Sequence, residues 1–210
     1  RRQRQMCIRD RKKELLLLKD EKEIEDRFYR DLEFGTAGLR GIMGAGSNRM
    51  NRYNVRKATK GFADYLQDTY GKRCQDGVII AYDSRNNSAD FAAEAAHVLC
   101  AAGIPVKFFT EPEPIPVLSF SVRHFRAAGG IVITASHNPA NNNGIKIVRE
   151  KGIPVSADTG LKDIERVAFS SEFENCAEKG HVYTKEIIED YIQSLLSFVD
   201  ISKMKPLKIV

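Results

Sequence analysis

The sequence predicts an α/β fold in which helices flank a mixed, largely parallel sheet in layers. Short apolar runs rich in β-branched residues alternate with longer segments of helical periodicity. The run at 131–134 is apolar and β-branched throughout, as expected of a strand covered on both faces. The chain has 210 residues, of which 42% are hydrophobic and 29% charged. This composition excludes disorder, collagen and a minimal disulfide scaffold.

The elements follow from local patterns. Residues 12–33 favour a surface helix, and the frequent glycines of 34–41 favour a short strand and a turn. A capped helix is expected from Asn54 to about Tyr70, with Gly71 as its C-terminal stop. The remaining elements are expected in this order: a strand at 78–81, a helix capped by Ser88 or Asp90 and ending at Gly103, a strand at 104–109, a helix ending near Phe125, the central strand at 131–134, a strand at 145–148, and weak helices at 158–168 and 185–199.

The net charge of +5 is concentrated at one end. Residues 1–13 hold seven basic side chains and one acidic one, so this arm carries +6 and the remainder carries 5 − 6 = −1. Nucleic-acid binding needs basic side chains gathered on a face, so it is not expected outside the arm. We expect three parts: a basic arm at 1–13, one α/β domain at 14–203 and the start of a second domain at 204–210. The chain lacks an initiating methionine and stops within a predicted strand, so a fragment is expected.

The four cysteines lie far apart, and no C-x-x-C spacing occurs. This argues against a zinc site or a redox dithiol, and reduced thiols in the cytoplasm are the simplest interpretation. The apolar run at 15–18 is too short for a signal peptide or a membrane span. No membrane partner is therefore expected.

Residues 134–146 carry the strongest chemical signal. Ser136 follows the predicted central strand, at the edge where ligands collect in open α/β sheets. Asn138-Pro139, the asparagines at 141–143 and Gly144 are typical of a turn with left-handed residues. The chain contains no G-x-S-x-G motif, which argues against the nucleophile elbow of an acyl hydrolase. It also contains no P-loop motif, which argues against a P-loop nucleotide-binding site. From composition alone, an ordinary turn is the more frequent interpretation.

Three motifs together resemble the first domain of the α-D-phosphohexomutase family. They are F-G-T-A-G-L-R-G at 34–41, T-A-S-H-N-P at 134–139 and N-G-I-K at 143–146. The match runs over about 15–210, and G-A-G-S-N-R-M-N at 44–51 is most similar to the phosphoglucomutase branch with phosphopentomutase-like members. The resemblance implies a four-domain cytoplasmic enzyme. It would move a phosphoryl group between positions 1 and 6 of a hexose, or 1 and 5 of a pentose, through a bisphosphorylated sugar.

The resemblance also implies roles for single residues. Ser136 would be the phosphoserine, and its phosphate would bind Mg²⁺. Lys146 would assist as general acid and base, with His137 as the competing candidate, and Arg40 would neutralise phosphate. Taken singly, each also has an ordinary structural interpretation. Lys146 fits an exposed strand lysine, His137 fits a turn histidine, and Arg40 fits a surface ion pair.

Two further positions match the family after the strand at 78–81, where it commonly has Asp-x-Arg. Asp83 and Arg85 are expected to form an ion pair that supports the site, with direct catalysis as the alternative. Asn138, in the serine motif, is expected to bind substrate.

The family's other Mg²⁺ ligands come from a D-G-D-x-D-R motif, and no Asp-x-Asp occurs in this chain. We therefore expect the chain alone to be inactive and to need its remaining domains, Mg²⁺ and a sugar bisphosphate activator such as glucose 1,6-bisphosphate. Two other functions stay open. One is a catalytically silent phosphosugar-binding relative, and the other is a nucleic-acid or anionic-surface binder that uses the arm. Residues 1–11 lie outside the family match, so a non-native origin for them also stays open.

Overall fold

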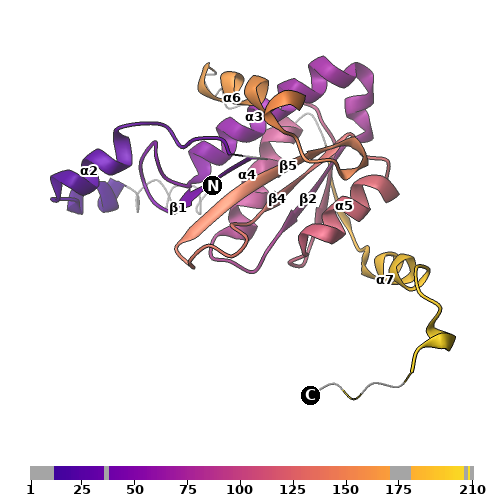
Figure 1. Ribbon diagram of the computed structural model, residues 1–210. Coiled ribbons are helices and arrows are strands. Elements are labelled where there is room, and N and C mark those ends of the chain that lie inside the picture. The colour runs from indigo at the N-terminus through magenta and orange to yellow at the C-terminus, as the bar shows by residue number, and fades with distance from the viewer. Residues whose placement is uncertain (1–11, 36–37, 171–180, 206–207, 209–210) are drawn as a thin grey trace.

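The computed structural model describes residues 12–35, 38–170, 181–205 and 208. At its centre is a six-stranded sheet in the order β1-β5-β4-β2-β3-β6 (Figure 1). The strands are β1 Gly38–Ile42, β2 Val78–Tyr82, β3 Val106–Phe109, β4 Gly129–Ile133, β5 Asn142–Arg149 and β6 Val182–Lys185. Neighbours from β4 to β6 are parallel, whereas β5 is antiparallel to both β4 and β1. The prediction of a mixed, largely parallel sheet is confirmed.

Helices cover both faces of this sheet (Figure 1). The layer on one face contains α3 Arg52–Tyr70, α4 Ser88–Ala101 and α6 Leu161–Ser170, and the other face carries α5 Ile115–His124. The remaining helices are α2 Glu21–Phe28, which lies beside the sheet, and α7 Ile188–Leu196, which contacts α5. Successive residues of β2 face opposite sides, as the pleat requires. Ile80 packs with α3 and α4, and Ile79 packs with α5. The helix α6 lies so close to α3 that a Cβ on Gly61 would be 2.2 Å from the carbonyl oxygen of Ile164.

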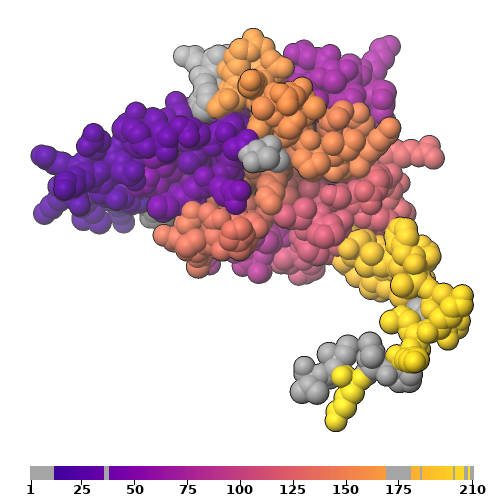
Figure 2. All heavy atoms as spheres, viewed as in Figure 1, coloured from indigo at the N-terminus to yellow at the C-terminus, as the bar shows by residue number. Residues whose placement is uncertain are grey.

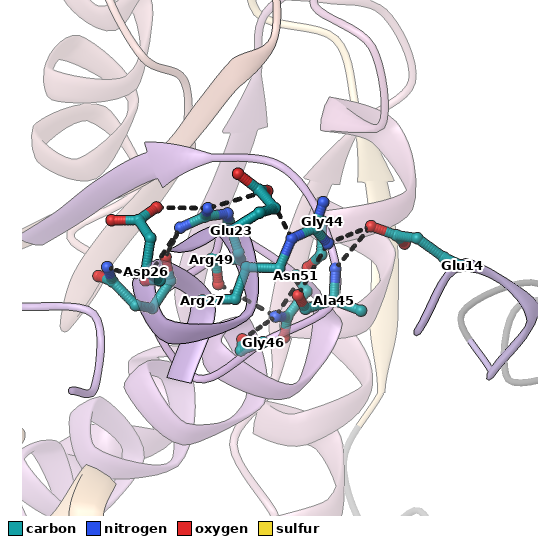
Figure 3. A network of polar contacts seen from close by, with 10 residues as sticks. Glu14, Glu23, Asp26, Arg27, Gly44, Ala45, Gly46, Arg49 and Asn51 are labelled. Carbon is teal, nitrogen blue, oxygen red and sulfur yellow. Dashed lines mark hydrogen bonds and ion pairs between the residues drawn. The ribbon is translucent and has the colours of Figure 1, made fainter. Parts of the chain in front are cut away.

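The segment around α2 forms a lobe at one side of the sheet, and the chain after α7 extends away from the body (Figure 2). A polar network ties α2 to the loop that follows β1 (Figure 3). Its central member is Arg49, whose side chain is 4% exposed and whose guanidinium contacts Asp26 at 2.5 Å and Glu23 at 3.3 Å. Among the described residues, no helix combines the length and the apolar character that a membrane crossing requires.

Several predicted helix starts are wrong. The single helix expected at 12–33 is broken, because Asp20 begins α2 by accepting a hydrogen bond from the backbone N–H of Lys22. The cap of α3 is Asn51 and not Asn54, since Asn51 Oδ1 accepts from the backbone of Tyr53 and Asn54. Gly71, by contrast, ends α3 as predicted.

Asn87 precedes α4, so neither Ser88 nor Asp90 is its cap. Ser88 lies inside the helix, and its hydroxyl donates to Asp83 instead.

The strand β6 was not predicted, because its residues fell in a stretch without clear periodicity. It lies at the sheet edge beside β3, and Val182 and Tyr183 are about half exposed. An edge strand without a buried face gives no alternating pattern to detect. The arm at 1–11 and most of the strand expected at 206–210 lie outside the described residues.

Candidate functional site

Ser136 stands three residues beyond the end of β4, the central strand, and its side chain is exposed. Its backbone φ is +57°, a left-handed conformation that is uncommon for residues other than glycine. Such a conformation costs about 1–2 kcal/mol and persists only where surrounding contacts enforce it. The backbone N–H of Ser136 donates to Oγ1 of Thr134 at 3.0 Å. The loop thus presents the serine hydroxyl to solvent in a fixed backbone geometry.

The sequence predicted left-handed residues at 141–144, but the left-handed residue of this loop is Ser136. The asparagines at 141–143 and Gly144 have no positive φ, and β5 begins at Asn142. Gly144 is required for a different reason, since a Cβ there would lie 2.7 Å from the carbonyl oxygen of Leu39.

Asn143 is fully buried, and its amide donates to the Asn86 carbonyl at 3.0 Å and to Ser88 Oγ at 2.9 Å. Sequence reasoning missed Asn143 and Ser88 as supports of the loop, because an asparagine run gives the same signal for an exposed turn.

Asp83 and Arg85 follow β2 and lie under the serine loop. Their side chains form an ion pair, with 3.4 Å between Arg85 Nε and Asp83 Oδ2. The terminal nitrogens of Arg85 donate to backbone carbonyls of the loop, the shortest bonds being those to Ser136 and Asn138 at 2.7 Å. Both acidic and basic members of the pair are therefore used to hold the loop.

The predicted site residues are distributed between two neighbouring hollows. Ser136, Asn138, Asp83 and Arg85 line a hollow of about 480 Å³. Arg40 and Lys146 line a cleft of about 600 Å³ on the face of the sheet that also carries α5. The two are joined where Arg40 Nη1 donates to Asn138 Oδ1 at 3.4 Å.

His137 and Lys146 thus hold different positions relative to the serine. Nδ1 of His137 lies 3.4 Å from Ser136 Oγ. Lys146, on β5, opens into the other cleft and does not line the hollow that contains Ser136. The structure therefore gathers the serine, His137, Asn138, Asp83 and Arg85 directly. Arg40 and Lys146 line the neighbouring cleft, and Arg40 reaches the serine loop through Asn138.

A divalent cation would find few ligands in this region. Within the described ranges, no group of three or more His, Cys, Asp or Glu side chains is arranged to hold a metal ion. Asp83 is the acidic residue that lines the Ser136 hollow, and its carboxylate already accepts from Ser88 and pairs with Arg85. The described residues do not by themselves fit a complete Mg²⁺ site, which needs several oxygen ligands.

Comparisons with known proteins identify the domain. Residues 31–175 match the family described as phosphoglucomutase/phosphomannomutase, alpha/beta/alpha domain I. Over 138 residues the chain is 41% identical to a phosphoglucomutase of Staphylococcus haemolyticus, covering 66% of this chain and 25% of that protein. Over 149 residues it is 38% identical to a phosphopentomutase of Homo sapiens, covering 68% and 24%. The chain therefore spans about a quarter of the length of these relatives.

Solved structures agree with the sequence matches. A putative phosphomannomutase from Thermus thermophilus superposes with a TM-score of 0.71 and 28% identity, covering 82% of this chain and 37% of that one. The sequence and the fold thus point to one group of proteins, and the family match at 31–175 includes the residues of the three motifs noted above. The chain belongs to the phosphoglucomutase/phosphomannomutase family and contains its α/β/α domain I.

Proposed function

We propose that this chain is the part of a sugar-phosphate mutase that carries the reacting serine, Ser136. The enzyme would interconvert sugar 1-phosphates and 6-phosphates, or pentose 1- and 5-phosphates, through a bisphosphorylated sugar. The observation that carries the proposal is the exposed hydroxyl of Ser136, held in a left-handed backbone conformation at the end of the central strand. Family membership supports the reaction class, and two of the relatives are named phosphoglucomutase and phosphopentomutase.

The chemistry requires little of the protein beyond positioning and charge neutralisation. In the first transfer the bond between phosphorus and Ser136 Oγ breaks and a bond from phosphorus to a sugar oxygen forms. In the second transfer the bond from the other phosphorus to its sugar oxygen breaks and a bond to Ser136 Oγ forms. Arg40 is exposed and contacts Asn138 of the loop, so it is suited to neutralise phosphate oxygens there. Asn138, through its side-chain amide, is suited to bind the substrate at the junction of the two hollows.

The attacking sugar hydroxyl loses a proton in the first transfer, and the other sugar oxygen gains one when it leaves phosphorus in the second. Lys146 is our candidate for this general acid and base role, because it lines the cleft next to the serine hollow. His137 is the competing candidate, since its ring nitrogen is 3.4 Å from Ser136 Oγ. Arg85 and Asp83 would act on the loop and not on the sugar.

The remaining parts of the reaction are assigned to the rest of the protein. A phosphorylated Ser136 would give Mg²⁺ one oxygen ligand, and the other ligands and a sugar bisphosphate activator such as glucose 1,6-bisphosphate would be held by other domains. We propose residues 14–203 as the serine domain and 204–210 as the start of the next, with 1–13 as an arm without a catalytic role. We propose a cytoplasmic setting, because the four cysteines lie far apart in the sequence and no C-x-x-C spacing occurs.

The test uses the complete protein that contains this chain. With Mg²⁺ and glucose 1,6-bisphosphate present, Ser136→Ala should lower the turnover of glucose 1-phosphate at least about 1,000-fold, because the phosphoryl acceptor is lost. Mass spectrometry should find the phosphoryl group on Ser136 of the parent protein. Ser197→Ala, which removes an exposed hydroxyl after α7, is the matched control and should keep full activity.

Three outcomes would contradict the proposal. They are wild-type turnover by Ser136→Ala, robust turnover by the 210-residue chain alone, and an unphosphorylated Ser136 in a protein that still binds sugar phosphate. The last outcome would identify a silent phosphosugar-binding relative.

A further inference from the structure

We propose that Arg85 is a positioning residue for the serine loop. Its guanidinium, oriented by Asp83, gathers the backbone carbonyls of the loop and thereby holds Ser136 in its left-handed conformation. The structural part of this inference is independent of what Ser136 does. Its catalytic consequence rests on the proposed function.

The evidence is the pattern of hydrogen bonds around one side chain. A guanidinium has five N–H donors in a fixed planar fork. The two terminal nitrogens of Arg85 donate to four backbone carbonyls, namely Ser136 at 2.7 Å, Asn138 at 2.7 Å, Pro139 at 2.9 Å and Asn142 at 3.3 Å. The remaining nitrogen, Nε, faces the carboxylate of Asp83 at 3.4 Å. All three nitrogens of Arg85 are thus directed either at the loop or at Asp83.

This arrangement explains how the loop tolerates its geometry. Four carbonyl oxygens that converge on one point repel each other unless a positive charge lies between them. The side chain of Arg85 is 16% exposed, so its charge-assisted bonds are largely shielded from water. Lysine would bring the charge as a single point with three donors, which cannot reach four carbonyls in one plane. An arginine is therefore the side chain that fits.

The orientation of Arg85 is itself fixed by buried groups. Asp83 Oδ1 accepts from the backbone N–H of Arg85 at 3.0 Å and from Ser88 Oγ at 2.6 Å. Ser88 Oγ in turn accepts from the fully buried Asn143. The start of β5, the first turn of α4 and the residues after β2 thus form a chain of hydrogen bonds that ends on the Asp83 carboxylate beside Arg85.

The N–H groups of Arg85 already have hydrogen-bond partners within the protein, and this distinguishes a positioning role from phosphate binding. An arginine that binds phosphate needs free N–H groups facing the ligand, whereas those of Arg85 are already bonded to the loop and Asp83. Loss of Arg85 should therefore displace Ser136 without removing a contact to the sugar. In the complete enzyme this predicts a lower kcat with a nearly unchanged KM for the sugar phosphate.

The first experiment measures the loop directly, by hydrogen exchange and NMR on the full chain. Two loop amides report on it, Asn138 N–H bonded to the Ala135 carbonyl and Asn142 N–H bonded to the Pro139 carbonyl. In Arg85→Gln and Arg85→Lys both should exchange at least about tenfold faster, with amides of β4 unchanged, because the bonds that close the loop are lost. Scalar couplings of Ser136 should show that its positive φ is no longer held. Arg166→Gln, which removes an exposed arginine from α6, is the control and should change neither readout.

Chemical rescue adds a readout that general destabilisation would not give. In Arg85→Ala, millimolar methylguanidinium should slow exchange of the loop amides again and restore part of kcat in the complete enzyme. Should Arg85→Gln fail to fold, Asp83→Asn decides the question, since it keeps the shape of the side chain and should give a smaller acceleration of the same amides.

The outcomes distinguish this proposal from the proposed function. Unchanged loop exchange and an unchanged φ at Ser136 in the Arg85 variants would overturn the positioning role, whatever the activity. A raised KM for the sugar phosphate in the Arg85 variants, with the loop unperturbed, would instead indicate that Arg85 binds phosphate. Full turnover by Ser136→Ala would remove the catalytic consequence, while the exchange data would still decide whether Arg85 holds the loop.

Discussion

Two weakly exposed arginines organise two different loops of this domain, and they differ in the balance of carboxylate and carbonyl partners. Arg49 contacts the carboxylates of Asp26 and Glu23, as well as the backbone carbonyls of Asp26 and Asn48, and so fixes helix α2 against the loop after β1 (Figure 3). Arg85 donates mainly to neutral backbone carbonyls, and so fixes the conformation of a single loop. A guanidinium bonded to carboxylates joins two elements. One bonded to carbonyls shapes a backbone and leaves the side chains of that loop free to react.

The largest effect expected from this comparison concerns stability. Arg49→Met should lower the free energy of unfolding by about 2 kcal/mol, because a buried guanidinium is lost while its carboxylate partners are exposed enough to regain water. Urea unfolding measures this change. Arg166→Met, which breaks an exposed ion pair with Asp163, should change the free energy by less than about 0.5 kcal/mol.

The same variant tests whether the two loops are independent. Amide exchange in the serine loop should be unaltered by Arg49→Met, measured on the folded protein. Faster exchange at Asn138 would mean that both arginines belong to one cooperative unit, and the comparison would then fail.

A smaller effect should reveal the strain at Ser136. With φ at +57°, Ser136→Gly should be more stable than Ser136→Ala by about 0.5–1 kcal/mol, because glycine adopts the left-handed region without the Cβ clash. Thermal or urea unfolding of the pair gives the difference. At Ser197, where φ is −68°, the order should be reversed. An alanine variant as stable as the glycine variant at 136 would show that the loop stores no strain.

The smallest effect is a pH dependence confined to the α2 region. Hydrogen bonds from Arg27 and then Arg49 hold the pKa of Glu23 below its ordinary value of 4.5. A lowered pKa means that the folded state favours the ionised form, so the contribution of Glu23 is complete above pH 4.5 and is lost as pH falls through the lower, folded-state value. Backbone carbonyls do not titrate in this range, so the carbonyl partners of Arg85 add no such dependence of their own.

Amide exchange in α2, followed as pH falls below 4.5, measures the effect. In Glu23→Gln the acid-induced acceleration in α2 should be reduced, because the titrating partner is gone. An equal acceleration in the parent protein and the variant would assign the pH dependence to other groups.

The sequence by itself determined the order of helices and strands from α3 to α6, the central strand and the place of Ser136 just after it, but not the edge strand β6. Those features depend on periodicity and on turn residues within a few positions, so one segment at a time suffices to predict them. Asp83 and Arg85 were also paired correctly, since they are two residues apart at one strand end.

Only the tertiary structure decided which residue is left-handed and what holds it there. Arg85 is 51 residues from Ser136, and Asn143 is 55 residues from Ser88, so no local pattern connects them. The cap of α3 is a local case, because Asn51 accepts from the backbone of Tyr53 while the side chain of Asn54 donates to the nearby carbonyls of Ser47 and Arg49. Hydrogen-bond partners are set by which chain segments the packed core brings together, and that information appears only once the sheet has formed.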